Sequence, residues 1–151
     1  VMLSFLYQTR MIPIEGRDTP IVYFLIFICS WGCDTCAYAV GMLIGKHKMA
    51  PILSPKKSIE GGIGGIVGAA LLGAIYGMIF DLDIRGCVIL CAAGGAVSQI
   101  GDLAASAIKR NHNIKDYGHL IPGHGGILDR FDSVIFTAPI IYALTLLVFS
   151  R

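Results

Sequence analysis

The sequence predicts an all-α, polytopic integral membrane helical bundle with about four transmembrane helices in a single domain, residues 1–151. Hydrophobic residues make up 55% of the chain, charged residues make up only 15%, and the mean hydropathy is +0.72. An ordinary soluble domain carries about 25% charged residues. A chain with so few charges cannot cover a globular surface with polar groups, so we expect lipid to cover part of it.

Four segments are apolar and long enough to cross a bilayer core, which takes about 20 residues of α-helix. We expect helices because a backbone that faces lipid must satisfy its polar groups within its own segment. The predicted spans are approximately residues 20–45, 61–80, 85–108 and 133–150. The chain begins with an apolar run from Val1 to Gln8, like the end of a helix that starts upstream. We therefore expect it to be the C-terminal part of a longer protein.

The first span contains one acidic residue, Asp34, and three of the five cysteines. A carboxylate at membrane depth costs about 2.5 kcal/mol or more unless it faces a polar cavity or a partner. Asp34 is therefore either a functional residue or half of a buried ion pair. Cys33 and Cys36 form a C-x-x-C pair, which can indicate redox or zinc chemistry. Within a membrane cysteine behaves as a small apolar residue, so we interpret all five cysteines as packing residues.

Small residues dominate the second and third spans. Four glycines lie within residues 61–65 at the start of the second span, and Asp102 lies inside the third. Small residues let membrane helices approach closely, and we expect this role for most of the glycines. The first four also border a basic loop, where their amides could approach a phosphate. Asp102 raises the same two possibilities as Asp34, a functional carboxylate or a structural ion pair.

Two connections between the spans are strongly basic. Residues 46–57 and 109–130 each contain four Lys or Arg residues, whereas the opposite connection, residues 81–85, contains one. The positive-inside rule places both basic connections in the cytoplasm. Clustered cations attract the phosphates of nucleotides or of lipid headgroups. Neither stretch carries interleaved aromatic residues, so nucleic acid is not a predicted partner.

The second basic connection belongs to a dense charged segment, residues 101–132, with the sequence GDLAASAIKRNHNIKDYGHLIPGHGGILDRFD. Carboxylates, cations and glycines together suit Mg²⁺ with a polyphosphate, because Mg²⁺ takes one or two carboxylates and shares its other sites with water and phosphate. Asp129 and Asp132 lie one helical turn apart at the start of the last span. An N-cap role is their alternative, with Asp132 as the favoured cap. His124 is either a general base or metal ligand, or a residue that only hydrogen-bonds the backbone.

The charged segment also carries a motif. Thirteen residues within 106–132 reproduce the spacing S-x-x-K-R-x4-K-D-x-G-x3-P-x-H-G-G-x2-D-R-x-D. This spacing resembles the signature of the phosphatidate cytidylyltransferases, also called CDP-diacylglycerol synthases. W-G-C-D-T-C-A-Y at residues 31–38 resembles the family's W-x-x-D-T-x-A-Y, and residues 45–61 resemble its S-P-K-K-T-x-E-G region. Cys36 and Ser58 depart from the family's usual residues, and neither departure removes a charged group.

The resemblance implies an enzyme that joins CTP to phosphatidic acid and releases CDP-diacylglycerol and pyrophosphate, with Mg²⁺ as its cofactor and room for a second cation. It also implies a homodimer in the lipid bilayer, placed in a bacterial inner membrane with the active site facing the cytoplasm. Family members carry further spans N-terminal to this region. Because phosphatidate is already an anion, its attack requires no strong general base, which weakens a catalytic role for His124.

The resemblance assigns roles to residues at matching positions. The catalytic residues would be Asp102, Asp129, Lys109 and Arg130, with Asp102 and Asp129 as the metal ligands. The substrate-binding residues would be Asp34, Ser54, Lys56, Lys57, Arg110, Lys115, Asp116, His124, Gly125, Gly126 and Asp132.

Three alternatives compete with this interpretation. A CTP-dependent polyprenol or lipid kinase would transfer the γ-phosphate and release CDP. An ion or proton transporter would use Asp34 and Asp102 as a relay, but it leaves the charged segment unexplained. A non-catalytic membrane scaffold would not need the Asp and Lys pattern.

Overall fold

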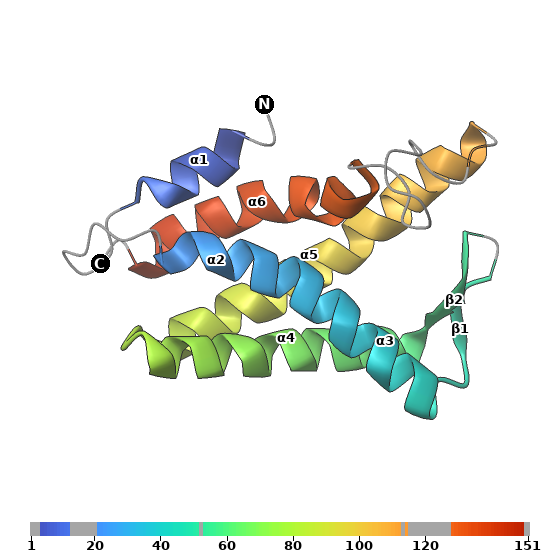
Figure 1. Ribbon diagram of the computed structural model, residues 1–151, viewed down its shortest axis with the longest axis horizontal. Coiled ribbons are helices and arrows are strands. Elements are labelled where there is room, and N and C mark those ends of the chain that lie inside the picture. Colours follow the sequence, from blue (N-terminus) through green and yellow to red (C-terminus); the bar gives the residue numbers. More distant parts are fainter. Residues whose placement is uncertain (1–3, 13–20, 52, 113, 115–127, 150–151) are drawn as a thin grey trace.

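The computed structural model describes residues 4–12, 21–51, 53–112, 114 and 128–149 (Figure 1). Its elements follow the chain as six α-helices, one π-helical segment (η1) and a two-stranded hairpin. Their bounds are α1 Ser4–Arg10, α2 Ile21–Phe27, η1 Ile28–Gly32, α3 Cys33–Ile44, β1 Lys48–Ala50, β2 Ser54–Ser58, α4 Ile59–Ile79, α5 Ile84–Asn111 and α6 Leu128–Phe149.

Within the described residues, four helical segments are long and apolar enough to cross a membrane: Ile21–Ile44, which joins α2, η1 and α3, Ile59–Ile79, Ile84–Asn111 and Phe131–Phe149. They confirm the four predicted spans, and the chain is a polytopic helical membrane protein. The first span differs from the prediction in one respect. It is not a uniform α-helix, because η1 interrupts it directly before Asp34.

Side-chain caps mark where α4 and α5 begin. Ser58 caps α4, where its Oγ accepts a hydrogen bond from the backbone N–H of Gly61 at 3.1 Å. Asp83 caps α5 by accepting from the N–H groups of Arg85 (3.3 Å) and Gly86 (3.0 Å). Asp81, in the turn between these helices, has a positive φ of 50°. The turn is therefore tight, and α4 and α5 run antiparallel side by side (Figure 1).

Glycine lets α4 pack closely between α3 and α5. A Cβ at Gly65 would lie 2.8 Å from the Cβ of Ala37 on α3 and 3.0 Å from the Nε2 of Gln99 on α5. A Cβ at Gly73 would lie 2.6 Å from the Sγ of Cys91. These contacts confirm the packing role predicted for most of the glycines.

The apolar side chains form two groups, one buried and one exposed. One set forms a buried core between α2, η1, α5 and α6, and it includes Val22, Leu25, Ile26, Cys29, Cys87, Leu90, Cys91, Val134, Ala138 and Ile141. Another set is exposed along one side of α4, at Ile63, Val67, Leu71, Ile75 and Met78. Residues three and four apart share a helix face, so this row is a continuous apolar stripe. Lipid accounts for such a stripe, because soluble proteins rarely expose one.

The hairpin of the first basic connection lies at the same end of the bundle as the two helix ends that flank the second (Figure 1). The β1–β2 hairpin, the end of α5 and the start of α6 lie at this end, while the turn between α4 and α5 lies at the other (Figure 1). The hairpin itself was not predicted. It pairs Lys48 with Ser58 and Ala50 with Ser54 in antiparallel register.

Candidate active site

A cavity of about 550 Å³ lies beside the hairpin at the basic end of the bundle. Side chains from α3, the hairpin and α5 supply its polar lining, and the first turn of α4 closes one wall. The lining residues are Asp34, Ala37, Tyr38, Gly41, Met42, Lys48, Lys57, Ser58, Gly61, Gly62, Gln99 and Asp102. The cavity therefore brings together Asp34, Lys57 and Asp102, which are far apart in the sequence.

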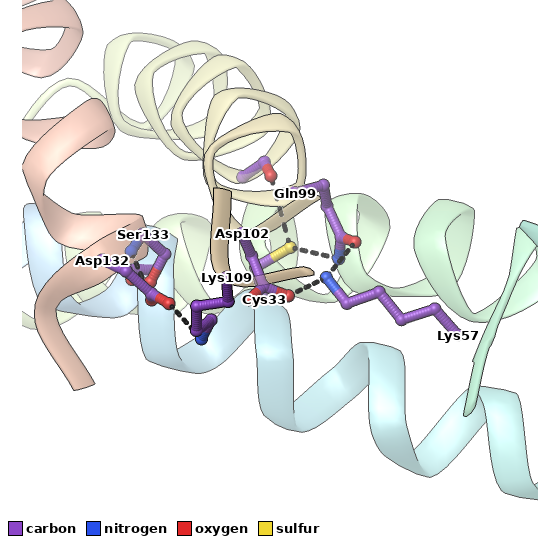
Figure 2. Close-up of polar contacts among 9 residues, drawn as sticks. Cys33, Lys57, Gln99, Asp102, Lys109, Asp132 and Ser133 are labelled. Atoms are coloured by element: carbon purple, nitrogen blue, oxygen red, sulfur yellow. Dashed lines mark hydrogen bonds and ion pairs between the residues drawn. The ribbon is translucent and has the colours of Figure 1, made fainter. Parts of the chain in front are cut away.

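Lys57 is the centre of the polar contacts in this cavity. Its ammonium group forms an ion pair with Asp102 and donates a 3.4 Å hydrogen bond to the Oε1 of Gln99 (Figure 2). The Nε2 of Gln99 in turn donates to the Sγ of Cys33 at 3.3 Å, and that thiol donates to the carbonyl of Gly95 at 3.5 Å. Lys57 is thus held by two acceptors on α5, and the buried thiol orients one of them.

A second ion pair joins α5 to α6. The Nζ of Lys109 lies 3.5 Å from the Oδ2 of Asp132, and both side chains are largely buried (Figure 2). The other carboxylate oxygen of Asp132 accepts from the backbone N–H of Ser133 at 2.7 Å. The hydroxyl groups of Ser133 and Ser30 are 2.6 Å apart, so this point is also tied to η1.

The two ion pairs lie near each other and near Asp34. Asp34 is close enough to Lys57, Asp102 and Asp132 to interact electrostatically with each, and Asp102 interacts with Asp132 in the same way. The described side chains therefore gather three carboxyl groups around two ammonium groups. Such an excess of carboxyl groups attracts a cation, and the ammonium groups attract phosphate.

The π-helical segment explains the position of Asp34. A π-helix inserts an extra residue per turn, which rotates the side chains that follow it, and such segments are frequent at functional sites. Asp34 comes two residues after η1 ends. It lines both the main cavity and a second cavity of about 480 Å³, whose other lining residues are Trp31, Thr35 and Phe131.

The sequence-predicted site residues divide into three groups. Asp34, Lys57 and Asp102 line the cavity, and Lys109 with Asp132 forms the adjacent pair. Ser54 begins β2 but is not among the residues that line the cavity, and Arg110 is exposed in the last turn of α5. The remaining predicted site residues lie outside the described part of the structure: the side chains of Lys56, Asp129 and Arg130, and all of Lys115, Asp116, His124, Gly125 and Gly126.

Two alternatives from the sequence can be compared with the geometry. Asp102 does form an ion pair, which is partly buried, but its partner Lys57 is itself a predicted substrate-binding residue in the cavity. The N-cap interpretation of Asp132 is wrong, because α6 begins at Leu128 and Asp132 lies in its second turn. Asp132 uses its side chain to contact α5 instead.

The cavity residues that were not predicted include Gln99, Lys48 and Tyr38. A signal for Gln99 was present, since an amide inside a predicted span needs hydrogen-bond partners. It also precedes Asp102 by three residues and so shares its helix face. Lys48 could not be distinguished from the other basic residues of its connection, because the hairpin that places it at the cavity was not predicted.

The sequence is similar to those of known proteins. The sequence matches the Cytidylyltransferase family over residues 1–148. It is 41% identical over 137 residues to the phosphatidate cytidylyltransferase of Bacillus subtilis (strain 168), which covers 88% of this chain and 51% of that protein. It is 42% identical over 142 residues to the phosphatidate cytidylyltransferase of Staphylococcus epidermidis (strain ATCC 12228 / FDA PCI 1200), covering 93% of this chain and 52% of that protein.

The chain spans about half the length of these curated relatives. The matched half contains the cavity, both ion pairs and all four candidate spans. By its sequence over nearly its whole length, the chain belongs to the cytidylyltransferase family.

Proposed function

We propose that this chain forms the active-site part of a phosphatidate cytidylyltransferase, which converts CTP and phosphatidic acid to CDP-diacylglycerol and pyrophosphate. The observation that carries this proposal is the pairing of Lys57 with Asp102 in a cavity at the basic end of a membrane bundle. Here a water-soluble nucleotide and a lipid phosphate can meet. The names of the relatives supply the reaction.

The reaction needs little proton transfer. A phosphatidate oxygen forms a bond to the α-phosphorus of CTP, and the bond from that phosphorus to the bridging oxygen of the β-phosphate breaks, so pyrophosphate leaves with the electron pair. Positioning and charge stabilisation supply most of the catalysis in such transfers. In this proposal Lys57, Lys109, Arg110, Lys115 and Arg130 bind the phosphates, and Lys57 exchanges its contact with Asp102 for a phosphate oxygen.

We further propose that Asp102 and Asp129 hold Mg²⁺, with a second cation nearby. The donor set fits: Asp102 lines the cavity, Asp132 is close to it, and Mg²⁺ needs only one or two protein carboxylates. Among the described residues no group of three His, Cys, Asp or Glu side chains is close enough to hold a metal by itself. When bound, Mg²⁺ would neutralise charge on the transferring phosphoryl group.

The placement in the cell is part of the proposal. We expect a bacterial inner membrane, because the relatives are bacterial proteins. We expect the active site to face the cytoplasm, because the hairpin of one basic connection and the helix ends that flank the other lie at the end of the bundle that holds the cavity (Figure 1). A homodimer is proposed from the family resemblance, and chemical cross-linking in membranes tests it.

Labelled CTP tests the reaction. Membranes with this chain, and with a version extended to the relatives' length, receive phosphatidic acid and Mg²⁺. The proposal predicts that α-labelled CTP transfers its label to a chloroform-soluble lipid and that pyrophosphate is released. Transfer of γ-label to a lipid alcohol would instead indicate the kinase. Ion flux without CTP in proteoliposomes, with no label transfer, would indicate the transporter.

A further inference from the structure

A carboxylate outside the cavity fastens the base of the hairpin that carries two of the cavity's cations. Glu60, in the first turn of α4, accepts hydrogen bonds from the backbone N–H of Lys46 at 3.2 Å and from that of His47 at 3.2 Å. The Nδ1 of His47 lies 2.6 Å from the Oε1 of Glu60 and donates to it, because a carboxylate only accepts. The Glu60 side chain therefore accepts hydrogen bonds from two backbone N–H groups and one imidazole ring, all of Lys46 and His47.

This contact lies where the chain passes from α3 into the hairpin. A further backbone hydrogen bond joins the N–H of Ile59 to the carbonyl of His47 at 3.0 Å, so the segment is tied to the start of α4 at two points. Hydrogen bonds to a charged group are stronger than those between neutral groups. We call the pair of Glu60 and His47 the hairpin clasp.

The hairpin clasp stands directly next to the cationic residues of the cavity. Lys48 follows His47 on β1, and Lys57 precedes Glu60 by three residues at the end of β2. Both lysines line the cavity, and the register pairs Lys48 with Ser58. The hairpin extends away from the helices (Figure 1), so its direction depends on contacts at its base.

We propose that Glu60 is a positioning residue: through the hairpin clasp it holds Lys48 and Lys57 at the cavity for phosphate binding. This inference rests on the proposed function. Glu60 does not line the cavity itself. Its loss should therefore weaken the binding of CTP more than the chemical step.

Steady-state kinetics in membranes test this role, with the version extended to the relatives' length or, if it is active, with this chain. Glu60→Ala is expected to raise the KM for CTP about tenfold with kcat within about twofold, because hydrogen bonds to a charged group are lost. Glu60→Gln keeps one acceptor oxygen and should restore most of the affinity. Asp83→Ala is the matched control, since it removes two hydrogen bonds to backbone N–H groups at the opposite end of the bundle and should leave the KM unchanged.

A double-mutant cycle separates positioning from general stability. If Glu60 acts through Lys48, the KM for CTP of the double variant should rise by clearly less than the product of the increases in Glu60→Ala and Lys48→Ala. Effects that multiply, or a Glu60→Ala protein with unchanged KM, would overturn the proposal.

Limited trypsin cleavage gives a readout that needs no activity. Glu60→Ala should speed cleavage after Lys46 and Lys48, whereas Asp83→Ala should not. If wild-type protein transfers no label to phosphatidate, the proposed reaction fails while this measurement still tests the hairpin clasp. Equal cleavage rates in wild type and Glu60→Ala would refute it.

Discussion

At the scale of single residues, the cavity is organised by the partners of one lysine. Lys57 contacts a carboxylate, Asp102, and a neutral amide, Gln99, that lie one turn apart on α5. In the proposed exchange of the Asp102 carboxylate for a phosphate oxygen, a second contact would keep the lysine in place. Gln99 supplies that fixed contact, because its own amide nitrogen is held by Cys33.

Removal of the amide should therefore weaken nucleotide binding. Gln99→Met retains a side chain of similar length but cannot accept from Lys57, and we expect the KM for CTP to rise about tenfold. Ser98→Ala is the control, because among the described residues the buried Oγ of Ser98 has no hydrogen-bond partner. Steady-state kinetics with α-labelled CTP measure both, and an unchanged KM for Gln99→Met would contradict this role.

At the scale of elements, the site depends on how closely α4 approaches its neighbours. Gly65 faces Ala37 and the carbonyl of Cys33 on α3, and Gln99 on α5, at hypothetical Cβ distances of 2.8 to 3.0 Å. A larger residue there would push apart the helices that carry Asp34 and Asp102. The glycines thus set the width of the cavity as well as the packing.

Two substitutions on the same helix distinguish close packing from helix propensity. Gly65→Ala should lower the free energy of unfolding by about 1–3 kcal/mol, because the added methyl group overpacks the interface. Gly62→Ala should leave stability unchanged or raise it, because its Cβ meets only the flexible end of Met49 and alanine favours helix. Thermal unfolding in detergent measures both, and equal stabilities would contradict the packing account.

The sequence predicts the elements better than their irregularities. The four spans follow from composition alone, and their ends agree with the helices to within a few residues, except that α6 begins earlier, at Leu128. The π-helical turn has no local signal in the sequence, and its Ser30 contacts Ser133 on a helix about a hundred residues later. The base of the short hairpin contacts Glu60 across thirteen residues, and this contact has no local sequence pattern.

The site was predictable only in part for the same reason. Asp34 and Asp102 were identified because charge is rare inside apolar spans, and Lys57 and Lys109 because they lie in a motif. Their pairing, Lys57 with Asp102 and Lys109 with Asp132, requires knowledge of which helices are neighbours.

At the scale of the whole molecule, the basic hairpin, the helix ends that flank the second basic connection and the cavity share one end of the bundle (Figure 1). The positive-inside rule then predicts that this end is cytoplasmic. Trypsin should cut after Lys48 in inside-out vesicles and not in sealed right-side-out vesicles. Arg85, at the start of α5 on the opposite end, should show the reverse pattern. Cleavage after Lys48 from the outside would contradict this orientation.

The central claim is that cytidylyl transfer takes place at the cavity of Lys57 and Asp102, and Asp102→Asn tests it most directly. Asn keeps the shape and can still accept from Lys57, so the fold should survive, as thermal unfolding in detergent can verify. We predict that transfer of α-label from CTP to phosphatidate falls at least about 10³-fold, because the proposed Mg²⁺ ligand loses its negative charge. Asp81→Asn, in the turn at the opposite end, should retain activity, since Asn tolerates a positive φ. Undiminished transfer by a folded Asp102→Asn protein would place the reaction elsewhere.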